Sequence, residues 1–237
     1  MKIGSVLMSS IEYPKIMSVV VFLSKCPLRC PYCANSELLK DGPEMTLEEV
    51  LKKINTQVDF ADAIVVSGGE PLVQLEDTIE ILKYAKGLNL KTKVDTSGVF
   101  PEKVKELIKT GLVDYIAMDV KAPFGKYKEI IGADIGDKVK ESMNLINTSN
   151  IYLECRTTYC DSLLTKEDIH TIAKEVDCDV YTIQQFRNRS VLDPELADIE
   201  SPNPQDMEKI AEEIKQYLPN TQIDIKTAEF GQKTISK

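Results

Sequence analysis

The sequence has no tryptophan and a single histidine, His170, so chemistry that depends on histidine is nearly excluded. No apolar run approaches the roughly 18 residues that a membrane span requires. Positive charge is also in the minority, because the net charge is −9. That balance disfavours a broad nucleic-acid-binding face. We therefore predict no membrane span and no nucleic-acid partner, and we expect a protein or small-molecule partner.

A secretory signal is missing as well, since the start of the chain lacks a basic flank followed by an apolar block. The six cysteines are therefore expected to be free thiols or metal ligands in the reducing cytoplasm. Apolar residues make up 43% of the 237 residues, which is enough for a substantial core. This length suits one α/β domain of the larger kind.

Three of the cysteines, Cys26, Cys30 and Cys33, lie within the short stretch CPLRCPYC. Soft thiolates select zinc, Cu(I) or an iron–sulfur cluster. A closed zinc site or a complete cluster needs a fourth ligand, and none lies nearby. A three-thiolate cluster would leave one iron open to a ligand that reacts. A zinc knuckle and a redox-active Cys-x-x-Cys pair stay open as alternatives at this point.

Hydrophobic patterning predicts six strand-and-helix units in series. The expected strands are 17–23, 61–67, 90–95, 113–119, 151–156 and 180–184, with amphipathic helices between them. Such a series implies a parallel sheet with right-handed crossovers, as a partial (βα)6 TIM-like barrel or a doubly wound sheet. Further expectations are a strand or hairpin within 1–15, irregular structure over 188–203, a last helix near 207–218 and a final strand near 223–225.

Residues with chemical potential follow all six predicted strands. In chain order they are the cysteine stretch, Gly68-Gly69-Glu70-Pro71, Asp95-Thr96-Ser97, Asp119-Val120-Lys121, Arg156, and Gln185-Phe186-Arg187. Turn chemistry alone could explain any one of them. Because the carboxyl ends of parallel strands meet at one edge, the six together predict a binding site on that rim.

With these motifs in place, the chain resembles the radical S-adenosylmethionine (SAM) enzymes. The resemblance rests on the Cys-x3-Cys-x2-Cys loop, with an aromatic residue before its last cysteine, and on the later Gly-Gly-Glu-Pro. More narrowly, VVFLSKCPLRCPYCANSELL, VVSGGEPL, KVDTSG, GLVDYIAMDVKAP and ECRTT resemble the glycyl-radical-enzyme activating proteins, especially those of anaerobic ribonucleoside-triphosphate reductase. The resemblance covers about residues 14–187. It implies a single radical SAM domain over 1–237, with 188–237 as a C-terminal extension that packs on the barrel.

The resemblance implies that Cys26, Cys30 and Cys33 hold a [4Fe-4S] cluster whose open iron binds SAM. Reductive cleavage of SAM would give a 5′-deoxyadenosyl radical, which would abstract a Cα hydrogen from a glycine of a glycyl radical enzyme. The expected protein substrate is an anaerobic ribonucleotide reductase. A low-potential electron donor such as flavodoxin or ferredoxin is the second implied partner.

The resemblance also implies contacts to SAM from the rim. The residues concerned are Tyr32, Ala34, Gly68, Gly69, Glu70, Asp95, Ser97, Asp119, Lys121, Arg156 and Arg187. Glu70 would take the methionine ammonium, while Lys121 and Arg156 would face the carboxylate or ribose. The alternative, purely structural interpretations are a turn role for Glu70 and ion pairs within the protein for Lys121 and Arg156. The chain departs from its relatives at Ala34 and Arg187, where related proteins have histidine.

Asp95 and Asp119 should lie at the ends of neighbouring strands, where two carboxylates repel each other unless a cation lies between them. The pyruvate formate-lyase activators use matching positions for a monovalent cation. The resemblance therefore implies such a site at Asp95, Thr96 and Asp119.

The remaining cysteines, Cys155, Cys160 and Cys178, are irregularly spaced and are expected to be buried free thiols rather than a second cluster. His170 is expected to be a solvated surface residue. Two other functions stay open: a radical SAM enzyme for a small molecule, similar to carboxy-deazaguanine synthase, and a non-catalytic Fe–S or SAM-binding module. The short chain favours an open face for a protein substrate, because little sequence remains to enclose a small one.

Overall fold

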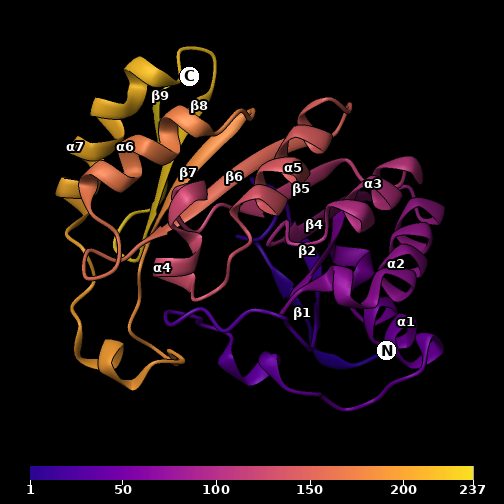
Figure 1. The fold of residues 1–237 in the computed structure, drawn as a ribbon. Helices are drawn as coiled ribbons and strands as arrows, with labels where there is room; N and C mark the ends of the chain where they lie inside the picture. Colours follow the sequence, from indigo (N-terminus) through magenta and orange to yellow (C-terminus); the bar gives the residue numbers. More distant parts are fainter. Residues whose placement is uncertain (237) are drawn as a thin grey trace.

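The computed structural model describes residues 1–236, which form one nine-stranded sheet that curves into a partial barrel with its helices outside (Figure 1). The strand order follows the chain from β1 to β9. Strands β2 to β8 are parallel, and the edge strands β1 and β9 run antiparallel to their neighbours. The predicted α/β partial barrel is confirmed, with seven parallel strands in place of the six expected.

The strands span Ile3–Ser9 (β1), Ser18–Leu23 (β2), Ala63–Gly68 (β3), Lys91–Thr96 (β4), Tyr115–Asp119 (β5), Tyr152–Tyr159 (β6), Val180–Gln185 (β7), Gln222–Thr227 (β8) and Gly231–Ser236 (β9). The helices span Leu47–Asn55 (α1), Leu75–Gly87 (α2), Pro101–Lys109 (α3), Tyr127–Ile131 (α4), Gly136–Asn147 (α5), Lys166–Glu175 (α6) and Pro204–Ile214 (α7). Short 3-10 helices follow several of the strands. All six expected strands are present, and β1 is the strand expected within 1–15.

The alternation of side chains along each strand divides the sheet into two faces. The outer face packs against the helices and forms the main core, with Val21, Ile64, Val94, Ile116 and Ile183 among its members. The inner face is apolar only in part, in a cluster of Tyr13, Val20, Ala63, Val65, Tyr115 and Ala117. The rest of the inner face carries the charged side chains described below.

The turn between β1 and β2 closes the amino-terminal end of the barrel. Tyr13 from this turn is buried, and its ring lies 5.5 Å from that of Tyr115 on β5. Lys93 on β4 donates to the backbone oxygen of Glu12 at 2.5 Å. The opposite end, where the parallel strands finish, is the rim that carries the predicted site residues.

Residues 188–236 contribute to the same sheet. The Pro-containing segment 188–203 is irregular, as expected, apart from a 3-10 helix over Pro194–Asp198. Helix α7 then buries Met207, Ile210, Ala211 and Ile214, and β8 pairs with β7 in parallel. Within residues 1–236, no helix is long and apolar enough to cross a membrane.

Candidate functional site

The cysteine loop leaves the end of β2 and is seated on the Gly-Gly turn after β3. Gly69 N–H donates to the oxygen of Leu23, and Glu70 N–H donates to the oxygen of Lys25. A side chain on Gly68 would place Cβ 2.0 Å from the oxygen of Leu23, and Gly68 has φ of +131°. The two glycines thus admit the backbone of the cysteine loop, and their expected contacts with SAM stay predictions.

The three thiols of the loop differ in exposure: Cys30 is buried, while Cys26 and Cys33 are half-buried. Burial raises the pKa of all three thiols, that of Cys26 to about 11, and the ammonium of Lys121 acts in the opposite direction. Within residues 1–236, no three His, Cys, Asp or Glu side chains are gathered closely enough to hold a metal ion. The loop therefore brings the right kind of donors to one place, but not in the converged geometry of a filled site.

Two other residues of the loop were expected to contact SAM. Tyr32 is buried, and its hydroxyl has no hydrogen-bond partner among the described residues. Ala34 is exposed at the surface of the loop. Their contacts with SAM remain predictions. Arg29 folds back over the same loop and donates to the backbone oxygens of Cys26 and Leu28 at 2.7 and 2.8 Å.

Glu70 is fully buried and joins the turns after β3 and β4. Its carboxylate accepts hydrogen bonds from the N–H groups of Leu72 and Ser97, at 3.0 and 2.7 Å. It also accepts from the hydroxyls of Thr96, at 2.9 Å, and Ser97. This arrangement corresponds to the turn role, which was one of the two interpretations of Glu70; the other was a contact with SAM. A direct contact from Glu70 to the SAM ammonium stays a prediction, and it requires at least one of these donors to move away.

Asp95 on β4 and Asp119 on β5 are brought together, as expected, and the cation between them belongs to the protein. The guanidinium of Arg156 on β6 lies 2.9 Å from Asp119 and 3.5 Å from Asp95. Lys93 pairs with Asp95 at 2.9 Å, and Lys121 pairs with Asp119 at 2.9 Å. The result is a continuous charge network along the inner rim (Lys93, Asp95, Arg156, Asp119 and Lys121).

The network keeps both carboxylates ionised. Burial opposes the ionisation of Asp119, but Arg156 and Lys121 outweigh it and lower its pKa to about 2. Burial likewise opposes the ionisation of Asp95, whose pKa is nevertheless lowered by Arg156 and Lys93. Side-chain cations therefore already balance the charges of the two carboxylates, so charge balance alone does not require a monovalent cation. The cation site stays a prediction, and activity compared in Na⁺, K⁺ and a bulky organic cation tests it. Equal activity in all three would remove it.

Thr96 and Ser97, which were expected to help bind the cation and SAM, point their hydroxyls at Glu70 instead of at the network. Arg187, after β7, is exposed at the surface, so a contact from it to the adenosyl half of SAM remains a prediction. Its neighbour Gln185 is buried and holds the chain together locally, because its amide donates to Pro202 O and accepts from Ala228 N–H. Gln185 therefore has a structural role, and a contact from it to SAM, like that of Arg187, stays a prediction.

Some members of the site were missed by sequence reasoning. Lys93 is only 1% exposed and neutralises Asp95, while Ser67 donates to the other oxygen of Asp95 at 2.9 Å. The signal for Lys93 was its spacing, because residues two apart on a strand share a face and Lys93 precedes Asp95 by two. Glu154, a third inner-face residue, accepts from Tyr115 and Thr182 at 2.9 and 2.7 Å.

The remaining cysteines are buried free thiols in the structure, in line with expectation for Cys155, Cys160 and Cys178. The expectation for His170 was wrong. Its ring is half-buried between α6 and α7, lies 3.1 Å from the carboxylate of Glu213 and meets the edge of Tyr217. Two helices that pack together thus enclose a side chain that the sequence pattern placed in solvent.

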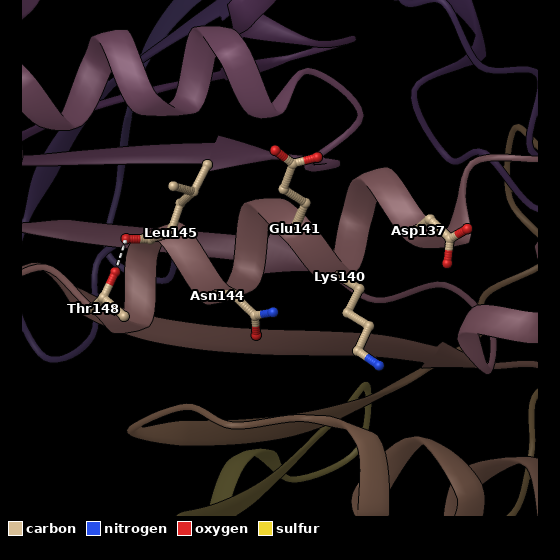
Figure 2. A pocket seen from close by; sticks show the side chains of 6 residues that line it. All are labelled: Asp137, Lys140, Glu141, Asn144, Leu145 and Thr148. Atoms are coloured by element: carbon tan, nitrogen blue, oxygen red, sulfur yellow. Dashed lines mark hydrogen bonds between the residues drawn. The ribbon is translucent and has the colours of Figure 1, made fainter.

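A hollow of about 420 Å³ lies away from the rim. Figure 2 shows that α5 and its end supply the whole lining, which consists of Asp137, Lys140, Glu141, Asn144, Leu145 and Thr148. None of these is a predicted site residue. The hollow is open, and none of its lining residues lies at a strand end, so we do not assign the chemistry to it.

Comparison with known proteins decides the family. Residues 20–176 match the Radical SAM superfamily. The chain belongs to the radical SAM superfamily. Members use a [4Fe-4S] cluster and SAM, and this radical SAM chain is an enzyme of that class.

Relatives of this radical SAM enzyme include activating proteins. A protein of Methanocaldococcus jannaschii, provisionally named a glycyl-radical enzyme activating enzyme, is 42% identical over 227 residues, which are 93% of this chain and 94% of its own. The pyruvate formate-lyase-activating enzyme of Clostridium pasteurianum is 36% identical over 120 residues, covering 48% of this chain and 49% of its own. The radical SAM enzyme is thus related to the Methanocaldococcus jannaschii protein over nearly its whole length and to the Clostridium pasteurianum enzyme over about half.

Solved structures share the fold at low identity. SuiB of Streptococcus suis, bound to its precursor peptide SuiA, has a TM-score of 0.67 and 16% identity, covering 88% of this chain and 48% of SuiB. A domain of a pyruvate-formate lyase-activating enzyme from Bacteroides vulgatus has a TM-score of 0.54 and 15% identity, covering 68% of this chain and 96% of that domain. The radical SAM chain spans about half the length of SuiB.

Proposed function

We propose that this radical SAM enzyme activates a glycyl radical enzyme by removing a hydrogen atom from the Cα of one glycine, with Cys26, Cys30 and Cys33 as the cluster ligands. The observation that carries the proposal is the shared rim, where the cysteine loop lies beside an ionised network on the ends of three neighbouring strands. The 42% identity, over 93% of this chain, with a relative provisionally named a glycyl-radical enzyme activating enzyme supports the substrate class.

The three thiols fit a cluster by the chemistry of the donor set. They are soft ligands on one loop, and three of them leave one iron for an outside ligand. Lys121 lowers the pKa of each thiol and so offsets part of the rise that burial causes, in the direction of the thiolate that a metal requires. When bound, the cluster supplies the electron that splits SAM into methionine and a 5′-deoxyadenosyl radical.

The charged network offers matching partners for the two ends of the methionine part of SAM. Lys121 and Arg156 carry positive charge for its carboxylate, and Asp119 carries negative charge for its ammonium. Asp119 is the most available of the acids, because its side chain is 29% exposed against 9% for Asp95. Binding would thus exchange contacts inside the network for contacts to SAM, without leaving a buried charge unpaired.

A polypeptide is the substrate class that the architecture favours. The chain has little beyond its sheet and helices to enclose a small molecule, and the large hollow lies elsewhere on α5. SuiB, which has the same fold, is bound to a precursor peptide. An anaerobic ribonucleotide reductase is the glycyl radical enzyme that we propose, on the motif resemblance of residues 14–187, with flavodoxin or ferredoxin as the reductant.

The test is anaerobic incubation of the reconstituted, dithionite-reduced protein with SAM and an anaerobic ribonucleotide reductase. A doublet glycyl radical signal in the EPR spectrum is expected, together with one 5′-deoxyadenosine per radical. Cys30→Ala should abolish both products, whereas Cys160→Ala should leave them unchanged. 5′-Deoxyadenosine without the doublet would contradict this partner and favour a small-molecule substrate. Absence of SAM cleavage would contradict the catalytic assignment.

A further inference from the structure

The cysteine loop makes very few hydrogen bonds to the rest of the described chain. Between residues 26 and 36, the bonds of Arg29 to Cys26 and Leu28 are local, and so is the bond from Cys33 N–H to Cys30 O. The bonds to the Gly-Gly turn stop at Lys25, before the first cysteine. Among the described residues, the part of the loop that carries the thiols therefore has no hydrogen bond to the sheet, and it contacts the core through the side chains of Leu28, Cys30 and Tyr32.

Two long-range hydrogen bonds do hold this part of the loop, and both come from residues 188–199, which we call the strap. Asp193 N–H donates to the oxygen of Pro31, between the second and third cysteines, at 2.9 Å. Ser36 Oγ donates to the oxygen of Ser190 at 3.0 Å. In Figure 1 the strap is the orange segment at the lower left, beside the purple loop that follows β2.

The strap is itself fixed, so it can serve as an anchor. Leu196 is buried in the main core, and Asn188 Nδ2 donates to Ala197 O across the strap at 3.0 Å. The Asp193 side chain caps the short 3-10 helix by accepting from Glu195 N–H at 3.0 Å. Beyond the strap, Gln185 holds the oxygen of Pro202. A segment that is anchored through Leu196 thus supplies the long-range hydrogen bonds of the cysteine loop.

We propose that Ser190 and Asp193 are positioning residues, whose backbone groups hold the loop of Cys26, Cys30 and Cys33 in register for metal binding. The proposal rests on the proposed function, because it takes these thiols as the cluster ligands. The strap lies outside residues 20–176, the part that matches the superfamily model. Three cysteines on one loop can bind the same cluster only if the backbone of the loop keeps a fixed conformation.

The test removes single hydrogen bonds and compares matched variants. Asp193→Pro deletes the N–H that Pro31 accepts, at a residue whose φ of −88° is close to the range of proline. Asp193→Ala keeps that N–H and removes only the side-chain cap. Ser36→Ala removes the second bond, while Ser36→Thr keeps the hydroxyl. Should Asp193→Pro fail to fold, the Ser36 pair still tests the proposal.

Two readouts separate positioning from general stability. Hydrogen exchange of the metal-free protein should show faster exchange at residues 30–36 in Asp193→Pro than in Asp193→Ala, with the strands unchanged. In the reconstituted protein, the cluster absorbance should decay about two- to tenfold faster under a chelator, as expected for the loss of one hydrogen bond. Ser36→Ala should behave like Asp193→Pro, and Ser36→Thr like the wild type.

Equal exchange and equal decay rates within each pair would overturn the proposal. Its failure can be told apart from failure of the proposed function. If the wild type assembles no cluster but Asp193→Pro still speeds exchange at residues 30–36, the cluster assignment falls while the contact to the loop stands. If the wild type assembles the cluster and the pairs do not differ, only the positioning role falls.

Discussion

At the scale of single residues, several motif residues support other parts of the protein before they can meet a ligand. Gly68 and Gly69 make room for the cysteine loop, and Glu70 gathers the turn that contains Thr96 and Ser97. The sequence identified these positions, because Gly-Gly-Glu-Pro and Asp-Thr-Ser-Gly end strands. It could not show what these residues contact, because hydrogen bonds between two turns depend on which strands are neighbours in the sheet and on their register.

Gly68→Ala should therefore be strongly destabilising, by about 3 kcal/mol or more, because the new Cβ meets backbone and the residue has a left-handed φ. Gly87→Ala is the matched control, since a Cβ there meets nothing within 4 Å. It should be neutral or stabilise by up to about 1 kcal/mol, as Ala does in a helix. Urea unfolding of the metal-free protein, followed by circular dichroism, measures both. Similar midpoints for the two variants would contradict the packing argument.

Arg156 is the residue on which the charged network depends. Arg156→Ala would leave Asp95 and Asp119 without the guanidinium that they share, and breaking a buried pair in this way costs about 3–5 kcal/mol. Arg189→Ala is the control, because Arg189 is exposed and forms no ion pair within residues 1–236. It should change stability by less than about 0.5 kcal/mol. A small effect of Arg156→Ala would show that Lys93 and Lys121 balance the carboxylates alone.

At the scale of elements, the segments with strong local signals were predicted best. The capping boxes at Thr46 and Thr165 are visible in the sequence, and each begins a helix in the structure. Strand β9 was missed because GQKTIS has few apolar residues and lies at a sheet edge, where only one side must pair. Helix α2 ends at Gly87, and the left-handed φ that follows it falls on Asn89.

Asp168 at the start of α6 should make stability depend on pH in the acid range. Burial opposes its ionisation, but the hydrogen bonds from Lys126 and Thr165 outweigh it and lower the pKa below the usual 3.8. A lowered pKa means that the stabilisation is complete above about pH 4 and is lost as the pH falls through the folded value. Asp168→Asn should cost about 1–2 kcal/mol at pH 7, as for other lost caps.

The difference between Asp168→Asn and the wild type should then shrink below about pH 4, because the wild-type carboxyl also becomes neutral. Denaturant unfolding from pH 7 to pH 3 follows this change. Asp161→Asn, at an exposed position near the same helix, is the matched control for the substitution itself. A difference that stays constant with pH would mean that the carboxylate charge of Asp168 does not contribute.

At the scale of the whole molecule, serial strand–helix units were enough to predict a parallel sheet with its site on one rim. The strand–helix units could not predict how the two ends of the chain contribute to the barrel and to its site. The turn before β2 closes the inner face through Tyr13, and the strap reaches back to Pro31 from the far end of the chain. Such contacts join segments far apart in sequence, and no local pattern specifies them.

This closure predicts that the chain cannot be shortened to the segment with recognisable motifs. Ending it after Arg187 would remove the strap, α7 and β8, and would expose the edge of β7 together with the core that Met207 and Ile214 cover. We expect that fragment to aggregate or to unfold without a cooperative transition.

Ending the chain after Phe230 removes only the edge strand β9, so that variant should stay folded and keep β8 paired with β7. Size-exclusion chromatography and thermal melting compare the two. A cooperative, monomeric fragment 1–187 would show that β2 to β7 form a domain of their own, and the loop of Cys26, Cys30 and Cys33 would then have to hold its course without the strap.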